Sequence, residues 1–88
     1  MWKWYKLLNL SEIDRLDVPD YYLNIDMEEL GIQNIVISRG FGYSVLFLGY
    51  WITPGLNNRN AYIVENKVSA YIDEQRNLWV GFNANNMP

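Results

Sequence analysis

Cysteine and histidine are both absent from this sequence of 88 residues. Without them the chain can form no disulfide, no Cys/His zinc site, no thiol nucleophile and no imidazole acid or base. The longest apolar run, residues 43–52, is about half as long as a membrane-spanning helix requires. The first residues begin like a secretory signal, but Asn9, Ser11 and Glu12 interrupt it, so we expect a cytoplasmic protein with no membrane segment.

Apolar residues make up 50% of the chain and charged residues only 19%. This balance excludes a disordered chain, and the short length allows only one hydrophobic core. The sequence therefore predicts a single globular domain over residues 1–88. More segments have the residue pattern of strands than of helices. We therefore expect an α+β fold, dominated by an antiparallel β-sheet with short helical turns near the N-terminus.

The first twenty residues read as a strand followed by a helical turn. Residues 1–10 are aromatic and partly alternating, which predicts the strand. Ser11 is a candidate N-cap, with Ile13 and Leu16 on one face of the turn. Pro19 ends the turn, because the residue before a proline disfavours helix.

Two further strands are expected on either side of a second turn. Residues 21–25 and 32–38 are rich in aromatic or β-branched residues, which favour strands. Between them, Asp26 has the position of an N-cap and Gly31 that of a C′ residue, so residues 27–30 are expected to form one helical turn.

Residues 43–53 read as one central strand with apolar side chains on both faces. Its two predicted faces are Val45, Phe47 and Trp51 on one side and Leu46, Leu48 and Ile52 on the other. The sequence Pro54-Gly55 predicts a type II turn after it, followed by a polar loop over residues 57–60.

Residues 61–77 fit either of two structures. A helix capped by Asn60 would place several apolar residues on one stripe. Two strands broken at residues 65–67 agree better with the β-branched residues in the segment, so we favour strands. Residues 73–77 then form a hairpin turn into a last strand, and the polar tail 83–88 is expected to fray.

The patterns that could carry chemistry are weak. Pro19-Asp20 and the later Glu65-Asn66-Lys67 have the letters of a motif that holds Mg²⁺ for phosphodiester hydrolysis. An acidic chain does not suit a polyanionic substrate, however, and residues 65–67 are expected in a turn. The glycines of Gly40-Phe41-Gly42 precede a strand rather than the helix that a phosphate cradle needs. We therefore expect no enzymatic activity, no catalytic residues, no metal and no cofactor.

Fourteen aromatic residues are more than one small core readily covers, so we expect some of them to be exposed. Trp2, Trp4, Tyr21 and Tyr22 are the ones for which we predict exposure. Exposed Tyr and Trp side chains either anchor a protein interface or stack on bases and sugars. Basic residues are few and scattered, which argues against direct binding of nucleic acid.

Seven acidic residues and a single basic one lie between Ser11 and Glu29. Such a stretch is either a solvated face that aids solubility or a patch that docks on a basic protein surface. The second interpretation makes the candidate partner-binding residues Asp14, Asp17, Asp20, Tyr21, Tyr22, Asp26, Glu28 and Glu29.

These features together predict a non-enzymatic binding protein that occludes a protein target with a basic surface, such as a nucleic-acid-processing enzyme. In general character the chain is similar to phage- or plasmid-encoded inhibitors, anti-defence proteins and immunity proteins. The alternative is a module that sequesters a small ligand, or a self-assembling structural subunit of the virion type. A homo-oligomer would fit this alternative.

Overall fold

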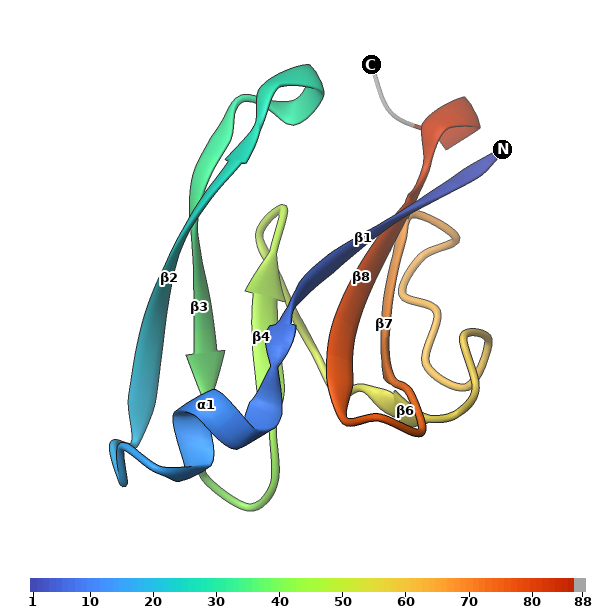
Figure 1. Cartoon of the computed structure of the whole chain (residues 1–88). Coiled ribbons are helices and arrows are strands. Elements are labelled where there is room, and N and C mark those ends of the chain that lie inside the picture. Colours follow the sequence, from blue (N-terminus) through green and yellow to red (C-terminus); the bar gives the residue numbers. More distant parts are fainter. Residues whose placement is uncertain (87–88) are drawn as a thin grey trace.

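A computed structural model, which describes residues 1–86, shows two four-stranded sheets and little helix (Figure 1). Sheet A has the strand order β1-β8-β7-β6, and sheet B has the order β2-β3-β4-β5. All neighbouring strands are antiparallel except β6 and β7. The elements are β1 (Trp2–Asn9), α1 (Leu10–Asp14), β2 (Asp20–Met27), η1 (Glu28–Leu30), β3 (Ile32–Ser38), β4 (Ser44–Phe47), β5 (Tyr50–Ile52), β6 (Gly55–Leu56), β7 (Val68–Ile72), β8 (Asn77–Asn83) and η2 (Ala84–Asn86).

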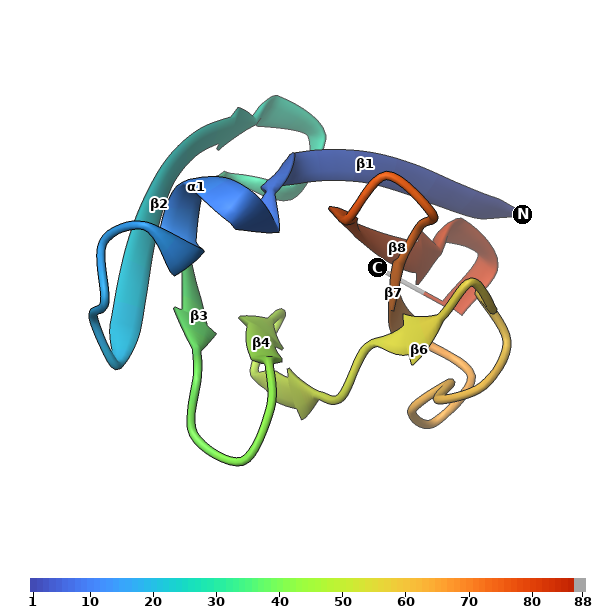
Figure 2. The same cartoon turned by 60° about the horizontal axis from the view of Figure 1, so that its bottom comes forward.

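The predicted small domain dominated by antiparallel strands is confirmed, whereas the α+β label fits only loosely. Helix is confined in the described residues to α1, which has five residues, and to the two short 3-10 turns η1 and η2. Seen from the end that carries α1, the strands form an open ring that runs from β2 through β3, β4, β6, β7 and β8 to β1 (Figure 2).

The core fills the space between the two sheets. Alternate residues of each strand point inward, which is the pattern expected when one face of a sheet is buried. Leu10 and Ile13 of α1 are fully buried and close one end of this core. The other fully or almost fully buried apolar side chains include Ile37, Val45, Phe47 and Ile52 from sheet B and Val68, Ala70, Leu78 and Val80 from sheet A.

The first helical turn forms where expected but is capped by a different residue. Asn9, rather than Ser11, is the N-cap, and its side-chain oxygen accepts a hydrogen bond from the Ser11 backbone N–H at 3.0 Å. Ile13 is buried, but Leu16 is 54% exposed, so the predicted Ile13–Leu16 face is wrong. The helix ends at Asp14, before Leu16 can join the buried side.

The second turn is a 3-10 turn over Glu28–Leu30. Gly31 follows it in the left-handed conformation at φ 67°, as the sequence indicated. Asp26 does not cap it: the N-cap position is held by Met27, which makes no side-chain cap hydrogen bond. Strand β2 continues through Asp26, because its pairing with β3 extends to Met27 and Ile32 beyond a bulge.

The predicted single strand over residues 43–53 is wrong, because the chain reverses in its middle. Leu48 and Gly49 form a two-residue loop with φ values of 51° and 84°, which suits a type I′ hairpin turn between β4 and β5. The reversal changes which side chains share a face. Ile52 joins Val45 and Phe47 in the core, whereas Trp51 points outward.

The strand with both faces covered is β7 instead. Every residue of Val68–Ile72 is buried. Residues 61–67 form turns rather than a helix or a strand, apart from one bridge between Val64 and Val68, and the expected break at residues 65–67 is present. The predicted Pro54-Gly55 turn is wrong: the chain passes straight from β5 into β6, which lies parallel to β7.

Three tyrosine–carboxylate hydrogen bonds join parts of the chain that belong to the two sheets. Tyr5 of β1 donates to Glu29 of η1, and Tyr50 of β5 donates to Glu65 of the β6–β7 loop at 2.6 Å. In the third of these hydrogen bonds, Tyr43, which lies just before β4, donates to Asp14 of α1. These contacts bridge the sheets at places where no backbone ladder connects them.

Candidate protein-binding face

An apolar row crosses the whole outer face of sheet B. Tyr22 of β2 pairs with Val36 of β3, Val36 pairs with Leu46 of β4, and Leu46 pairs with Trp51 of β5. Residues that pair directly across strands lie on the same face, and the inward-pointing neighbours of these four belong to the core. The register of the sheet therefore aligns four apolar side chains, which we call the apolar row.

The row is exposed at both ends. Tyr22 is 69% exposed and Trp51 is 55% exposed, while Val36 and Leu46 between them are partly covered. The flanking positions on this face are polar: Asp20, Ser38 and Ser44 pair on one side of the row, and Asn24 and Asn34 pair on the other. An apolar centre with Tyr and Trp anchors and a polar rim is the usual composition of a protein interface.

The face has charge of only one sign. The four strands of sheet B contain two acidic residues, Asp20 and Asp26, and neither Lys nor Arg. Both carboxylates are exposed, and neither makes an ion pair within residues 1–86. The outer face of sheet B is thus an apolar row beside an uncompensated acidic edge strand.

Three of the eight predicted partner-binding residues belong to this face. Exposed and covered positions alternate along β2, so Asp20, Tyr22 and Asp26 lie on its outer side. The two acids are six positions apart, a span of about 20 Å along a strand. Tyr21 points the other way and packs against the core, so it is not available on this face.

Asp14 and Glu29 are engaged within the chain. Asp14 accepts hydrogen bonds from Tyr43 and, at 2.8 Å, from Arg76, with Arg39 at 3.7 Å. The hydrogen bond from Tyr43, followed by the hydrogen bond and the positive charge of Arg76, lowers the pKa of Asp14.

Glu29 pairs with Lys3 at 2.8 Å, and the hydrogen bonds from Lys3 and Tyr5 lower its pKa. Their partners keep both Asp14 and Glu29 ionised and turned toward the protein itself. Asp17 and Glu28 are exposed, but they lie beyond the two ends of β2 and not on its outer face. The predicted residues thus do not form one patch in the described structure.

The remaining members of the row, Val36, Leu46 and Trp51, were not among the predicted site residues. Leu46 and Trp51 were expected on opposite faces of one buried strand. The signal that would have placed them together is Gly49 at the centre of the segment, because a two-residue turn there brings Leu46 opposite Trp51.

The residues that match the motif for metal-dependent phosphodiester hydrolysis lie in different parts of the fold. Asp20 begins β2 in sheet B, whereas Glu65 lies in the β6–β7 loop and accepts a hydrogen bond from Tyr50. Among residues 1–86 no group of three or more Asp or Glu side chains is arranged to hold a metal ion. Within the same residues, no helix has the length and apolarity that crossing a membrane would need.

Comparison with known proteins adds no relative: no family model matches the chain, and neither a curated protein nor a solved structure matches it significantly.

Proposed function

We propose that this chain is a non-enzymatic binding protein that covers a basic surface of another protein with the outer face of sheet B. The observation that carries the proposal is the apolar row, four strands wide, on a sheet with acidic side chains and no basic ones. Occlusion of the target surface would itself be the activity, as in stoichiometric inhibitors and immunity proteins.

The apolar row supplies the contact energy in this mechanism. Removing apolar surface from water is worth roughly 25 cal/mol per Å², and Tyr and Trp dominate the binding energy of protein interfaces. Tyr22 and Trp51 stand at the two ends of the row, so a partner that spans it would desolvate both rings. The target is expected to present apolar side chains opposite the centre of the row.

The two acidic side chains of edge strand β2, which we call the acidic edge, determine which partners are favoured. Asp20 and Asp26 favour a target whose Lys or Arg side chains surround its apolar patch, and they disfavour acidic surfaces. Complementary charge of this kind mainly accelerates association and weakens with added salt. The proposal specifies a target with a basic surface. A nucleic-acid-processing enzyme is one class of protein that has such a surface.

Affinity capture from cells of the source organism, with matched variants, tests the apolar row. Trp51→Ser should abolish capture of the target, whereas Leu16→Ser should preserve it. Leu16 is a suitable control because its exposure, 54%, nearly equals the 55% of Trp51, and it lies outside sheet B. Binding through the row would be contradicted if the Trp51→Ser variant still captured the target. It would also be contradicted if Leu16→Ser reduced the capture as much as Trp51→Ser does.

The association rate of the purified pair tests the electrostatic part. Asp20→Asn combined with Asp26→Asn should slow association several-fold at low salt and reduce its salt dependence. Glu74→Gln, which removes an exposed carboxylate from the β7–β8 turn, should change the rate much less. An association rate that is insensitive both to salt and to the double change would refute the acidic edge as a steering surface.

A further inference from the structure

Strand β2 is the edge of the described structure that is best able to take on a further strand. Among the other three edge strands, β6 has only two residues and β5 only three. β1 has eight, but it carries Lys3 and Lys6, and lysines on an edge strand oppose pairing with another chain. β2 also has eight residues, and it contains no Lys, Arg, Pro or Gly. Both views show β2 at the border of the molecule (Figure 1, Figure 2).

The backbone of β2 is hydrogen-bonded on one side only. The strand pairs with β3, and the register is regular from Asp20 to Asn24, before the bulge. On the side away from β3, no described residue pairs with the backbone of β2. Alternate residues of an antiparallel ladder direct their N–H and C=O groups to opposite sides, so about half of these groups in β2 face the free side. Such a row of groups is a template for another extended chain.

The inward-pointing side chains of β2 lack the cover that a further strand would give. Tyr21 pairs with Ile37 and Leu23 pairs with Ile35, and all four side chains belong to or pack against the core. Ile35 and Ile37 are 2% and 0% exposed, whereas Tyr21 and Leu23 are only partly buried. The reason is that β3 has a strand on both sides and β2 on only one. An added strand with apolar side chains on its inner face would bury the remaining surface.

The acidic edge selects a basic strand for this position. Asp20 and Asp26 are exposed on the outer side of β2 and make no ion pair within residues 1–86. Residues opposite each other in a ladder share a face, so the outer side chains of an added strand would lie beside the two carboxylates. Lys or Arg at two positions about six residues apart would meet both of them, whichever way the added strand ran.

The same charges disfavour a second copy of this chain as the added strand. Two copies of β2 paired antiparallel about Leu23 would place Asp20 of each copy opposite Asp26 of the other. Parallel pairing in register would place each carboxylate beside its own counterpart. Like charges directly opposite each other destabilise a sheet. The strand that fits this edge is therefore a basic segment of a different protein.

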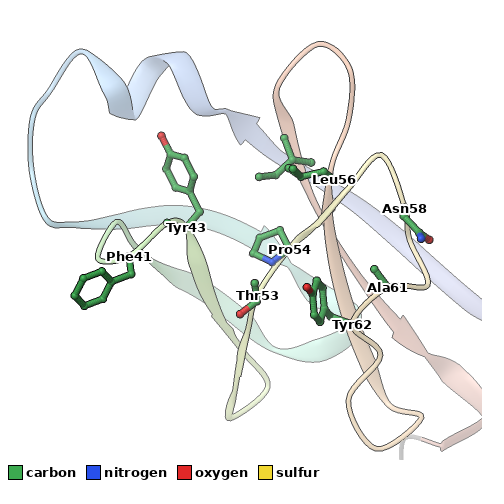
Figure 3. Close-up of a pocket in the computed structure, with 10 residues that line it drawn as sticks. Phe41, Tyr43, Thr53, Pro54, Leu56, Asn58, Ala61 and Tyr62 are labelled. Carbon is green, nitrogen blue, oxygen red and sulfur yellow. The ribbon is translucent and has the colours of Figure 1, made fainter.

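The apolar pocket between the two sheets offers no such selection by charge. It has a volume of about 540 Å³ and lies where the chain passes from sheet B to sheet A, with Tyr43 on one side, Leu56 on the other and Pro54 between them (Figure 3). None of the side chains that line it is charged, and none comes from β2. The edge of β2 differs because it combines free backbone groups, uncovered apolar surface and charge of one sign.

We propose that the partner contributes an extended segment bearing Lys or Arg, which adds to sheet B as a fifth strand beside β2. Backbone hydrogen bonds hold the segment, and its inner apolar side chains cover Tyr21 and Leu23. Its basic side chains meet Asp20 and Asp26. This inference rests on the proposed function, since it specifies how the same basic partner reaches the face of sheet B.

NMR titration with the capped peptide Lys-Val-Thr-Val-Thr-Val-Lys tests the pairing directly. The amide resonances of residues 20–26 should shift, and the amides that point away from β3 should become protected from hydrogen exchange. The peptide Glu-Val-Thr-Val-Thr-Val-Glu should bind at least about tenfold more weakly, because its charges face the two carboxylates. N-methyl groups on the Val and Thr nitrogens of the lysine peptide remove its backbone donors but not its charge, and should abolish binding.

Charge reversal separates pairing at β2 from a general attraction between opposite charges. Asp20→Lys combined with Asp26→Lys should reverse the preference, so that the glutamate peptide binds more tightly than the lysine peptide. Glu12→Lys combined with Glu74→Lys changes the net charge equally and should keep the original preference. Glu12 and Glu74 are suitable controls because both are exposed and lie outside sheet B.

Strand addition is overturned if the lysine peptide does not bind at millimolar concentration, if its N-methylated form binds as tightly, or if the shifts map outside β2. Equal binding of the two peptides, or a preference reversed by the Glu12 and Glu74 changes, overturns selection by the acidic edge. Failure of the proposed function is a different result: the target would still be captured after Trp51→Ser, whatever the peptides do at β2.

Discussion

The outer faces of the two sheets both carry aromatic side chains, but only one of them is covered by the chain itself. On sheet A, Trp2 stacks on Trp4, Trp4 meets Tyr71 edge to face, and Tyr71 stacks on Trp79, with ring centroids 5.3–6.0 Å apart. None of these four rings is among the exposed large apolar side chains. On sheet B, Tyr22 and Trp51 stand at opposite ends of the apolar row and remain exposed.

The loop between β6 and β7 completes the cover on sheet A. The Arg59 guanidinium lies 5.6 Å from the ring centroid of Trp4 and 5.4 Å from that of Tyr71. Ser69, fully buried on the outer side of β7, donates a hydrogen bond to the Arg59 carbonyl at 2.7 Å. The chain thus places its own cation over its own aromatic rings.

Aromatic content alone therefore does not identify an interface in this protein. Trp2 and Trp4 were predicted to be exposed on the same grounds as Tyr22, yet their rings are engaged by one another, by Tyr71 and by Arg59. What distinguishes sheet B is that the two aromatic ends of its row, Tyr22 and Trp51, remain exposed. We interpret sheet A's outer face as structural, and the outer face of sheet B is the one for which we propose binding.

The largest expected contrast between the two faces is in stability. Trp4→Ala removes the ring that contacts Trp2, Tyr71 and Arg59, and should lower the free energy of unfolding by about 2–3 kcal/mol. Trp51→Ala should lower it by less than about 1 kcal/mol, because more than half of that side chain is already in water. Chemical denaturation followed by circular dichroism measures both; equal losses would remove the distinction between the faces.

A smaller effect is expected from a methyl group placed under the sheet A cluster. A Cβ at Gly81 would lie 2.6 Å from the Trp4 ring, so Gly81→Ala must displace the ring and should cost about 1–3 kcal/mol of unfolding free energy. Gly40→Ala is the matched control, because its Cβ would meet nothing within 4 Å. If Gly81→Ala is as stable as Gly40→Ala in thermal unfolding, Trp4 does not pack on the β8 backbone as described.

The strands of this fold were largely predictable because their signals are local. Residues 1–10, 21–25 and 32–38 carry alternating or β-branched patterns, and each contains or overlaps an observed strand. The β4–β5 hairpin was missed because Leu48, an apolar residue that rarely adopts positive φ, occupies the first turn position. Gly49, at the second turn position, is the local residue that signals the reversal.

The candidate site was less predictable, because it depends on register. Tyr22 was identified from its own neighbourhood, but the row exists only because β3 and β4 bring Val36 and Leu46 between Tyr22 and Trp51. Sequence proximity also grouped Asp14 and Glu29 with Asp20. Their partners, among them Arg76 and Lys3, lie 62 and 26 residues away in the chain, so only the fold reveals that they are engaged.

Acid should weaken the sheet A cluster through one carboxylate. Asp73 accepts hydrogen bonds from the Trp79 ring N–H and from the backbone N–H groups of Gln75 and Asn77, all at 2.9 Å. These bonds, the one from Trp79 foremost, lower the pKa of Asp73 below its ordinary value. A carboxyl whose pKa is lowered by folding stabilises the protein above its unfolded pKa, and this contribution disappears as pH falls through the lowered value.

Unfolding experiments at neutral and acidic pH, with two matched variants, isolate that contribution. Asp73→Asn should be less stable than the wild type near neutral pH. The difference should shrink as pH falls below about 4, where the carboxyl of the unfolded chain becomes protonated, and shrink further as pH falls through the lowered pKa of the folded protein. Asp20→Asn removes a carboxylate from the exposed face of sheet B and leaves Asp73 in place. Its difference in stability from the wild type should therefore not show this decrease at acidic pH. A constant difference between Asp73→Asn and the wild type from neutral to acidic pH would mean that the Trp79–Asp73 hydrogen bond does not tie sheet A's outer face to the β7–β8 turn.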